Sequence, residues 1–282
     1  MTDNDKTILV LGATGKTGRR VVNGLRGRGA TIRAASRSGE VRFDWDDRNT
    51  WEPAFTGADA AYIVDMQDKP GSWDAEGQVR ELAKQAVDQG VRRLVLLQAR
   101  VLDKVGGKSL IAGERAVQES GAEWTVLRPN WFAQNFDEGV LLDGVVSGEL
   151  ALPAGHGREP FVDAADVAAV ATAALLDEGH AGQVYELSGP RAITIEDAVR
   201  DISRATGRTI RYRPVTHQAY VDELVSYEVP QDYALFVADL VAQIRDNRNA
   251  TPTDTVQRVL GRAPRDFSDF VKAAAATGVW NV

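Results

Sequence analysis

The sequence predicts an α/β fold: a parallel sheet, doubly wound with helices on both faces, followed by a smaller, mostly helical C-terminal lobe. Three observations predict it. Short apolar strands alternate with helices through the first half of the chain, a glycine-rich turn joins the first strand to the first helix, and the rhythm changes after Gly148. Alternation of this length is typical of βαβ units and a doubly wound sheet.

The first half supplies most of the predicted sheet. The glycine-rich turn leads into a helix marked by Val21, Val22 and Leu25. The segment 79–87 has the apolar stripe of an amphipathic helix, which Gly90 should end, and 112–120 is a further helix. Apolar runs predict strands at 7–11, 31–35, 59–64, 93–97 and 124–127.

The second half predicts one more strand of the sheet and then the lobe. Asp163 is placed to cap a helix through Leu176, and 184–187 is a strand that returns to the main sheet. A helix at 196–205 closes at Gly207, a strand follows at 210–213, and the remainder is mostly helical. We expect a first domain at 1–150, to which 161–190 return, and a substrate lobe at 191–282.

Composition excludes several classes of protein. The chain has 282 residues, 44% of them hydrophobic, which suffices for an independent core. It has no cysteine, so disulfides, a thiolate nucleophile and cysteine-ligated metals are excluded. Its histidines, His156, His180 and His217, are widely spaced and no motif groups them with carboxylates, so we expect no metal.

Charge and hydropathy predict a cytoplasmic protein. The net charge of -7 argues against nucleic acid as the main partner, although a local arginine could hold a small anion. Residues 1–6 lack the apolar stretch of a signal peptide, and the longest apolar run, 167–176, is far shorter than the roughly 20 residues that cross a bilayer. We expect a small-molecule substrate, no membrane partner and, as an open possibility, an oligomer.

The motif at the first turn predicts a dinucleotide site. Glycines permit a tight turn and let backbone amides approach a pyrophosphate, and the helix N-terminus adds unpaired N–H groups and partial positive charge. The alternative is a plain strand–helix turn without a ligand. The spacing argues against the alternative of a P-loop, because a P-loop needs a glycine where Val10 stands inside the strand. The motif reads Gly12-Ala13-Thr14-Gly15-Lys16-Thr17-Gly18.

The end of the second strand predicts NADP(H) rather than NAD(H). Enzymes that prefer NAD place an acidic residue about 20 positions beyond the glycine motif, where it accepts from the ribose 2′-hydroxyl. Here Ser36-Arg37-Ser38 stands at that place, and a guanidinium with flanking hydroxyls suits a 2′-phosphate. Asp44, in Phe43-Asp44-Trp45-Asp46, is a candidate acceptor for the adenine amino group, or a turn cap. The first domain is therefore predicted to be an NADP-binding, Rossmann-like domain.

Four segments together carry a family resemblance. They are the glycine motif, the run Leu127-Arg128-Pro129-Asn130-Trp131-Phe132-Ala133-Gln134-Asn135-Phe136, the run 161–168, and Tyr185-Glu186-Leu187-Ser188-Gly189-Pro190. In combination they resemble the NmrA-like branch of the atypical short-chain dehydrogenase/reductases, and above all its ergot-alkaloid-type (festuclavine and agroclavine dehydrogenase) group. The C-terminal segment Gly261-Arg262-Ala263-Pro264-Arg265-Asp266-Phe267 also resembles that group.

The resemblance implies an NADPH-dependent reductase and a residue for each part of the cofactor. Pro129, Trp131 and Phe132 would flank the nicotinamide ring, although both aromatic residues could equally fill the core. The pyrophosphate would lie on the glycine motif, at Gly12, Thr14, Gly15, Lys16, Thr17 and Gly18. Arg37, beside Ser36, would bind the 2′-phosphate, and Val64, Asp65 and Met66 would flank the adenosine half. Gln98 and Ala99 would lie beside the nicotinamide ribose.

One departure from the family pattern concerns the mechanism. The superfamily's usual Tyr-x-x-x-Lys pair donates a proton to a carbonyl oxygen, and the matching segment here is Leu110-Ile111-Ala112-Gly113-Glu114. Three interpretations stay open: an already activated acceptor such as an iminium ion, enone or carbonyl; another donor; or a redox sensor that binds NADP(H) without turnover. The candidate donors are Lys104, Lys108, His156 and Tyr220.

The lobe is expected to roof the crevice beyond the carboxyl ends of the strands and to bind a hydrophobic substrate. Ordinary helix packing is the alternative for these residues. With Trp131, the candidate substrate residues are Tyr220, Leu224, Tyr227, Tyr233 and Phe236, supported by Val237 and Leu240.

Overall fold

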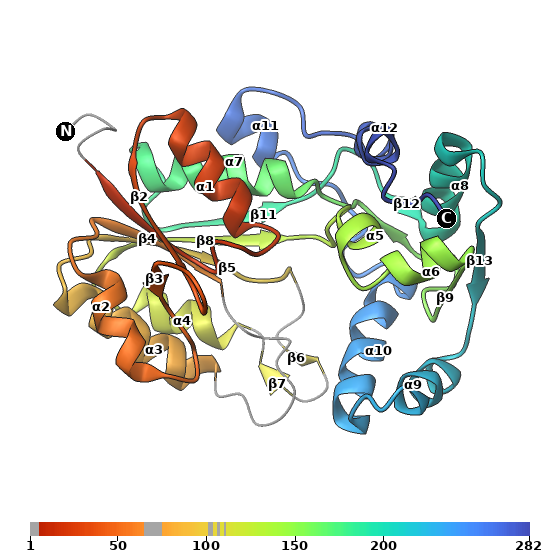
Figure 1. The fold of residues 1–282 in the computed structure, drawn as a ribbon, viewed down its shortest axis with the longest axis horizontal. Helices are drawn as coiled ribbons and strands as arrows, with labels where there is room; N and C mark the ends of the chain where they lie inside the picture. The colour runs from red at the N-terminus through yellow and green to blue at the C-terminus, as the bar shows by residue number, and fades with distance from the viewer. Residues whose placement is uncertain (1–5, 65–74, 101–103, 106–107, 110) are drawn as a thin grey trace.

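The computed structural model describes residues 6–64, 75–100, 104–105, 108–109 and 111–282 (Figure 1). Its centre is a seven-stranded sheet in the order β11-β8-β5-β4-β1-β2-β3, in which every neighbouring pair is parallel. The α/β fold class is therefore confirmed. The strands are β1 (Thr7–Leu11), β2 (Thr31–Ser36), β3 (Val41–Arg42), β4 (Ala60–Val64), β5 (Arg93–Leu97), β8 (Glu123–Pro129) and β11 (Gln183–Leu187).

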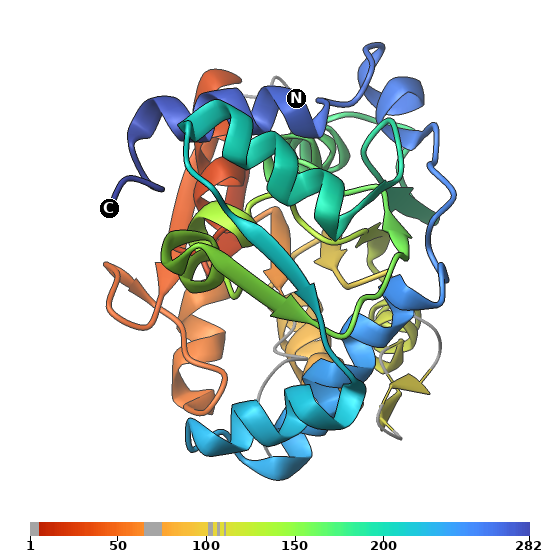
Figure 2. The ribbon, with the colours of Figure 1, turned by 90° about the vertical axis from the view of Figure 1, so that its right-hand side faces the viewer.

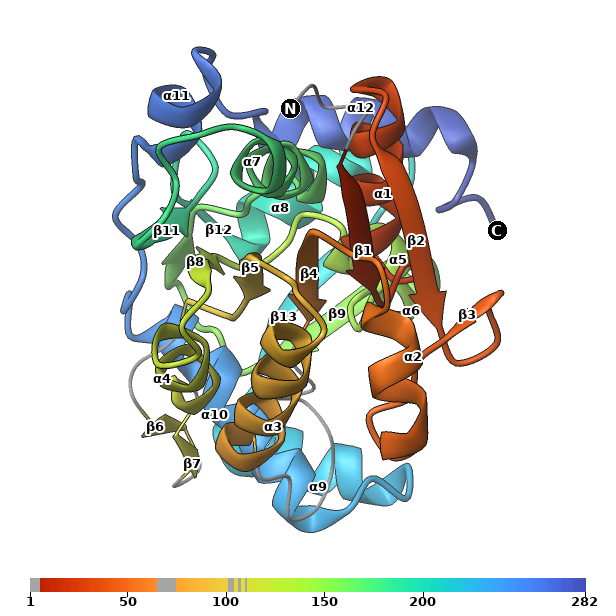
Figure 3. The ribbon, with the colours of Figure 1, turned by 90° about the vertical axis from the view of Figure 1, so that its left-hand side faces the viewer.

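Helices cover both faces of this sheet (Figure 3). One face carries α1 (Gly18–Gly27), α7 (Ala164–Leu176) and α11 (Thr255–Leu260), and the other carries α2 (Trp51–Phe55), α3 (Ala75–Asp88) and α4 (Ala112–Gln118). Side chains of β1 alternate between two cores: Ile8 and Val10 join the first, Leu9 and Leu11 the second. Burial on both faces explains why the strands are apolar throughout.

The lobe lies beyond the carboxyl ends of the strands (Figure 2). It has a core of its own, which includes Phe136, Leu150, Phe161 and Trp280. Residues on both sides of position 150 thus share one core, and β9 pairs in parallel with β13. Its elements are α5 (Asn135–Glu138), α6 (Leu142–Ser147), β9 (Glu149–Leu152), α8 (Ile195–Thr206), β13 (Arg211–Pro214), α9 (His217–Ser226), α10 (Gln231–Arg245) and α12 (Phe267–Thr277).

Local signals set several of these boundaries. The Asp163 side chain caps α7 by accepting from the Ala165 amide at 2.7 Å, as predicted from the sequence. Thr194 and Asp197 form a capping box at the start of α8, and Gly207 ends that helix with a φ of 67°. The predicted strand at 184–187 does return to the main sheet, beside β8. The domain limits themselves stay a prediction.

Short elements complete the described chain. They are the 3-10 turn η2 (Arg48–Thr50) and the strands β6 (Lys104–Val105), β7 (Lys108–Ser109), β10 (Arg158–Glu159) and β12 (Ile193–Thr194). Within the ranges that the structure describes, each helix is too short or too polar to cross a membrane.

Candidate functional site

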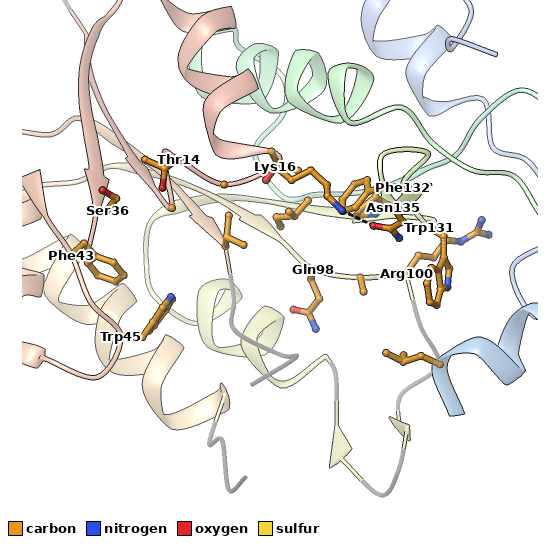
Figure 4. A pocket seen from close by; sticks show the side chains of 18 of the residues that line it. Thr14, Lys16, Ser36, Phe43, Trp45, Gln98, Arg100, Trp131, Phe132 and Asn135 are labelled. Atoms are coloured by element: carbon orange, nitrogen blue, oxygen red, sulfur yellow. Dashed lines mark hydrogen bonds between the residues drawn. The ribbon is translucent and has the colours of Figure 1, made fainter. Parts of the chain in front are cut away.

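A cavity of about 650 Å³ lies at the carboxyl ends of β1, β2, β4, β5 and β8, with α10 of the lobe on its far side (Figure 4). This is the edge of a doubly wound sheet where ligands bind, next to the point where strand order reverses between β1 and β4. The side chains and backbone that line it are Gly12, Thr14, Gly15, Lys16, Thr17, Ser36, Arg37, Phe43, Asp44, Trp45, Asp46, Val64, Leu97, Gln98, Ala99, Arg100, Pro129, Asn130, Trp131, Phe132, Asn135, Phe236 and Leu240.

The glycine motif forms the tight turn that its residues predict. Gly12 has a φ of 64°, a left-handed conformation that favours glycine, and its carbonyl accepts from the Gly15 amide at 2.9 Å. A Cβ on Gly18 would lie only 2.1 Å from the Gly12 oxygen, so Gly18 lets α1 pack directly on the turn rather than lining the cavity. The first turn of α1 contains no acidic residue, which leaves its partial positive charge uncompensated by the helix itself.

The end of β2 forms one side of the cavity. Arg37 is exposed, and its guanidinium makes no hydrogen bond or ion pair with any residue that the structure describes. Ser36 is buried beside it. The Asp44 carboxylate accepts from the Asp46 amide at 3.1 Å, as a turn cap does, and also borders the cavity, so both interpretations of Asp44 stay open.

Two aromatic residues at this end were missed as site residues by sequence reasoning. Phe43 and Trp45 are buried and pack edge to face, with ring centroids 5.3 Å apart, and both line the cavity (Figure 4). The signal was present, because they alternate with acidic residues in the segment that contains Asp44.

Gln98 lies in the middle of the cavity wall, immediately after β5 (Figure 4). It is only 2% exposed, yet neither atom of its side-chain amide has a hydrogen-bond partner among the described residues. Leaving a buried amide unpaired costs about 1–3 kcal/mol, so this side chain is suited to a ligand that supplies both an acceptor and a donor.

A buried polar network fixes the segment after β8. The Glu159 carboxylate accepts from Asn130 Nδ2 at 2.7 Å and from the Trp131 amide at 3.1 Å. Arg100 donates to Asn130 Oδ1 at 2.9 Å and pairs with Glu186 at 3.0 Å. Burial raises the pKa of Glu159 to about 7, against the opposing effect of these hydrogen bonds. The network holds the Trp131 backbone at the cavity wall.

Lys16 extends from the glycine motif across the cavity (Figure 4). Its ammonium donates to Asn135 Oδ1 at 2.5 Å and lies 5.6 Å from the centre of the Phe132 ring. Burial lowers the pKa of this ammonium, and the nearby carboxylates of Glu138 and Asp137 oppose that effect. Asn135, which sequence reasoning quoted only as part of a motif, is thus a cavity residue.

Only some of the substrate residues expected in the lobe line the cavity. Phe236 and Leu240 of α10 line the cavity, whereas Tyr220, Leu224, Tyr227 and Tyr233 are not among its lining residues. Tyr220 and Leu224 instead pack against Val221 and Ala238. Tyr227 is 72% exposed at the end of α9. The Tyr233 ring stacks on the ring of Phe236. Their role in substrate binding stays a prediction.

The candidate proton donors differ in position. His156 is exposed and does not line the cavity, and burial raises the pKa of Tyr220 to about 12. Asp65, Met66 and the side chains of Lys104 and Lys108 lie outside the described residues.

Glu114, which the resemblance is expected to match with the usual catalytic lysine, forms a buried ion pair. It is buried in α4, and its carboxylate pairs with the Arg128 guanidinium through two hydrogen bonds of 2.6 and 2.5 Å. Leu110, which the resemblance is expected to match with the tyrosine, lies outside the described residues. The described part of the chain also contains no group of three histidine or carboxylate side chains arranged to hold a metal ion.

The comparisons with known proteins extend over nearly the whole chain. The model of the NmrA-like family matches residues 4–271. The chain is 32% identical to the oxidoreductase YesF of Bacillus subtilis, over 97% of each protein. It is 31% identical to an NAD(P)H azoreductase of Xenophilus azovorans (95% of this chain, 98% of that protein) and 28% identical to an agroclavine dehydrogenase of Claviceps fusiformis (94% and 96%).

The same architecture occurs in solved structures. The NADPH-dependent quinone oxidoreductase of Escherichia coli, solved with NADPH, superposes with a TM-score of 0.76 at 20% identity, over 94% of this chain and 99% of that one. At this identity the likeness shows the fold alone. The match to the family model and the relative with 32% identity show the family as well, and they confirm the resemblance inferred from the motifs. The chain belongs to the NmrA-like family.

Proposed function

We propose that the protein is an NADPH-dependent reductase that transfers hydride to a small hydrophobic organic acceptor. One observation carries the proposal: the glycine motif, the Arg37 guanidinium and the unpaired Gln98 amide, which are separated in sequence, border one cavity. Its volume of about 650 Å³ falls within the range of about 300–1,000 Å³ typical of ligand and cofactor sites. When bound, NADPH supplies the hydride.

The donors around the cavity fit a dinucleotide. The turn from Gly12 to Thr17 and the N-terminus of α1 offer backbone N–H groups for a pyrophosphate, with no carboxylate in the first turn of the helix to repel it. Phe43 and Trp45 offer aromatic surface for the purine, and Gln98 offers an amide for the nicotinamide half. Binding of the 2′-phosphate would depend on one side chain, the cationic Arg37, whereas the pyrophosphate would be bound by several backbone N–H groups.

The rest of the cavity suits an apolar acceptor. At the end formed by the stretch after β8 and by α10, the apolar lining residues are Trp131, Phe132, Phe236 and Leu240. The relatives include an NAD(P)H azoreductase and an agroclavine dehydrogenase. We infer an iminium ion, activated enone or carbonyl compound as the acceptor class.

Replacing Arg37 tests the cofactor. Arg37→Ala should weaken NADPH binding by about 1–3 kcal/mol, roughly 5- to 150-fold, because a charged partner of the 2′-phosphate is lost, and should leave NADH binding nearly unchanged. The measurement is a titration of tryptophan fluorescence with each cofactor. Arg42→Ala is the matched control, since Arg42 is another exposed arginine at this edge of the sheet but pairs with Asp47 and does not line the cavity. Equal losses for NADPH and NADH would refute the assignment.

Turnover separates an enzyme from a sensor. NADPH oxidation is followed at 340 nm with cyclohexenone, menadione and N-methyl-3,4-dihydroisoquinolinium as neutral and cationic acceptors. Saturable oxidation with any of them supports the reductase. Tight NADPH binding with no oxidation by this panel favours the alternative, a non-catalytic NADP(H)-binding regulatory protein.

A further inference from the structure

The missing Tyr-x-x-x-Lys pair leaves a neutral acceptor without an obvious source of its proton. We propose that Lys16 is the general acid of the reduction, donating its ammonium proton to the acceptor atom that gains the electron pair. The inference rests on the proposed reductase function and goes beyond it by assigning a catalytic residue to that function. It adds a catalytic role to a residue of the glycine motif, whose backbone is expected to hold the pyrophosphate.

The position of the ammonium supports this role. The Lys16 side chain crosses the cavity to the stretch after β8, where its Nζ lies 2.5 Å from Asn135 Oδ1 and 5.6 Å from the Phe132 ring centre (Figure 4). That stretch is the one expected beside the nicotinamide ring. The cation therefore lies at the acceptor end of the cavity.

The surrounding backbone is shaped to the cation. A Cβ placed on Gly139 would lie 2.9 Å from Lys16 Nζ and 3.1 Å from Asn135 Oδ1, so the absence of a side chain at Gly139 leaves room for the hydrogen-bonded pair. An ammonium has three N–H donors, and Asn135 is its only hydrogen-bond partner among the described residues. The remaining donors are available to a ligand in the cavity.

Burial and, to a smaller extent, the positive charges of Arg20 and Arg19 lower the pKa of Lys16, whereas the carboxylates of Glu138 and Asp137 oppose that effect. On α5, Glu138 pairs with Arg19 and, at 2.8 Å, with Arg20 of α1, so that its carboxylate is compensated by other cations. Asp137 is the other acidic group near the ammonium, and burial raises the pKa of Asp137 to about 6. Neither carboxylate forms an ion pair with Lys16 within the described chain. Burial then lowers the pKa of Lys16, which is the direction that a general acid requires.

The step balances without a further reagent. For an enone or ketone, a C–H bond of NADPH would break and its electron pair would form the new C–H bond at the acceptor carbon, while the π electrons of the acceptor move to oxygen. That oxygen forms an O–H bond with a proton of Lys16, whose N–H bond breaks. The products are NADP⁺, the reduced acceptor and a neutral amine, which regains its proton from water. An iminium acceptor needs no proton, because hydride alone neutralises it.

This difference between acceptors provides the test. The kcat values of wild type and Lys16→Met are compared at saturating NADPH with cyclohexenone or menadione as neutral acceptor and with N-methyl-3,4-dihydroisoquinolinium as cationic acceptor. General acids contribute about 10²–10⁴-fold, so the ratio of the neutral to the cationic rate should fall at least 100-fold in the variant. Lys6→Met is the matched control and should keep the wild-type ratio, because the Lys6 ammonium donates to the Leu176 carbonyl outside the cavity.

A second readout needs no turnover. NADPH affinity of Lys16→Met, from fluorescence quenching without an acceptor, tests whether Lys16 instead serves the pyrophosphate. A 100-fold loss of affinity together with an unchanged rate ratio would overturn the proposal and leave the reductase function standing. So would a wild-type enzyme that reduces only the cationic acceptor. Failure of wild type to oxidise NADPH with any acceptor would remove the proposed function, and this inference with it.

Discussion

At the scale of single residues, the site departs from the rule that buried polar groups are paired. Gln98 is 2% exposed, and its side-chain amide has no hydrogen-bond partner among the described residues. Its backbone N–H donates to the Leu127 carbonyl at 2.9 Å, which fixes the position of the residue. Natural folds retain such a group at a stability cost when a ligand uses it. The position follows β5 directly, so the rigid sheet holds the amide at the cavity.

Removing this amide should separate stability from binding. Gln98→Leu keeps a similar volume and eliminates the unpaired polar atoms, so we expect the free energy of unfolding to rise by about 1–3 kcal/mol while NADPH affinity falls. Urea denaturation measures the first effect, and fluorescence titration with NADPH the second. A variant that binds NADPH as tightly as wild type would show that the Gln98 side chain makes no contact with the cofactor.

At the scale of elements, the cavity wall depends on a link between β8 and β10. Glu159 of β10 accepts from Asn130 and from the Trp131 amide, immediately after β8 ends. The pKa of this buried carboxyl is raised from 4.5 to about 7. Because the folded-state pKa is the higher one, the stabilisation from binding this proton is fully present below about pH 4.5 and is lost as the pH rises through about 7.

The variant Glu159→Gln should remove that part of the pH dependence. Its amide oxygen can still accept both hydrogen bonds but does not titrate. Between pH 4.5 and 8, wild type should lose about 3 kcal/mol of unfolding free energy relative to the variant, from the shift of Glu159 alone. Urea denaturation of both proteins at several pH values gives this difference, and the contribution of Asp137, also raised, cancels between them. Parallel pH curves would contradict the assignment.

At the scale of the whole molecule, the cavity joins the sheet domain to the lobe. Its floor comes from the ends of five strands, and its far wall from α10. Outside the cavity, α1 and α5 are tied by the ion pairs of Arg19 and Arg20 with Glu138. A ligand that fills the cavity therefore contacts both parts of the fold.

NADPH should consequently stabilise the entire chain as one unit. Binding to the folded state alone adds about 2.7 kcal/mol at a ligand concentration of 100 Kd, so Tm should rise with NADPH concentration and less with equal NADH. Differential scanning calorimetry, with the urea transition followed by circular dichroism, measures this effect. A rise confined to one of two separate transitions would contradict a shared site.

Much of this architecture follows from local patterns in the sequence. The Val- and Leu-rich segment 93–97, the glycine motif and the Asp163 cap each act through neighbours a few residues away, so strands, helix starts and the cofactor turn can be predicted from the residues themselves. The order of elements then fixes the edge of the sheet at which the cavity lies.

Packing between segments that are distant in the sequence determined the contacts of the site residues. Lys16 meets Asn135 across 119 positions of sequence, and no local pattern specifies that contact. Tyr220 and Leu224 of α9 are partly buried against a cluster that includes Ala238 of α10, and this packing between two helices leaves them outside the lining of the cavity. The sequence alone determined the fold class, the glycine turn and the family. Only the tertiary structure decided which polar groups are left unpaired and which cation enters the cavity, because burial and pairing depend on segments that are distant in the chain.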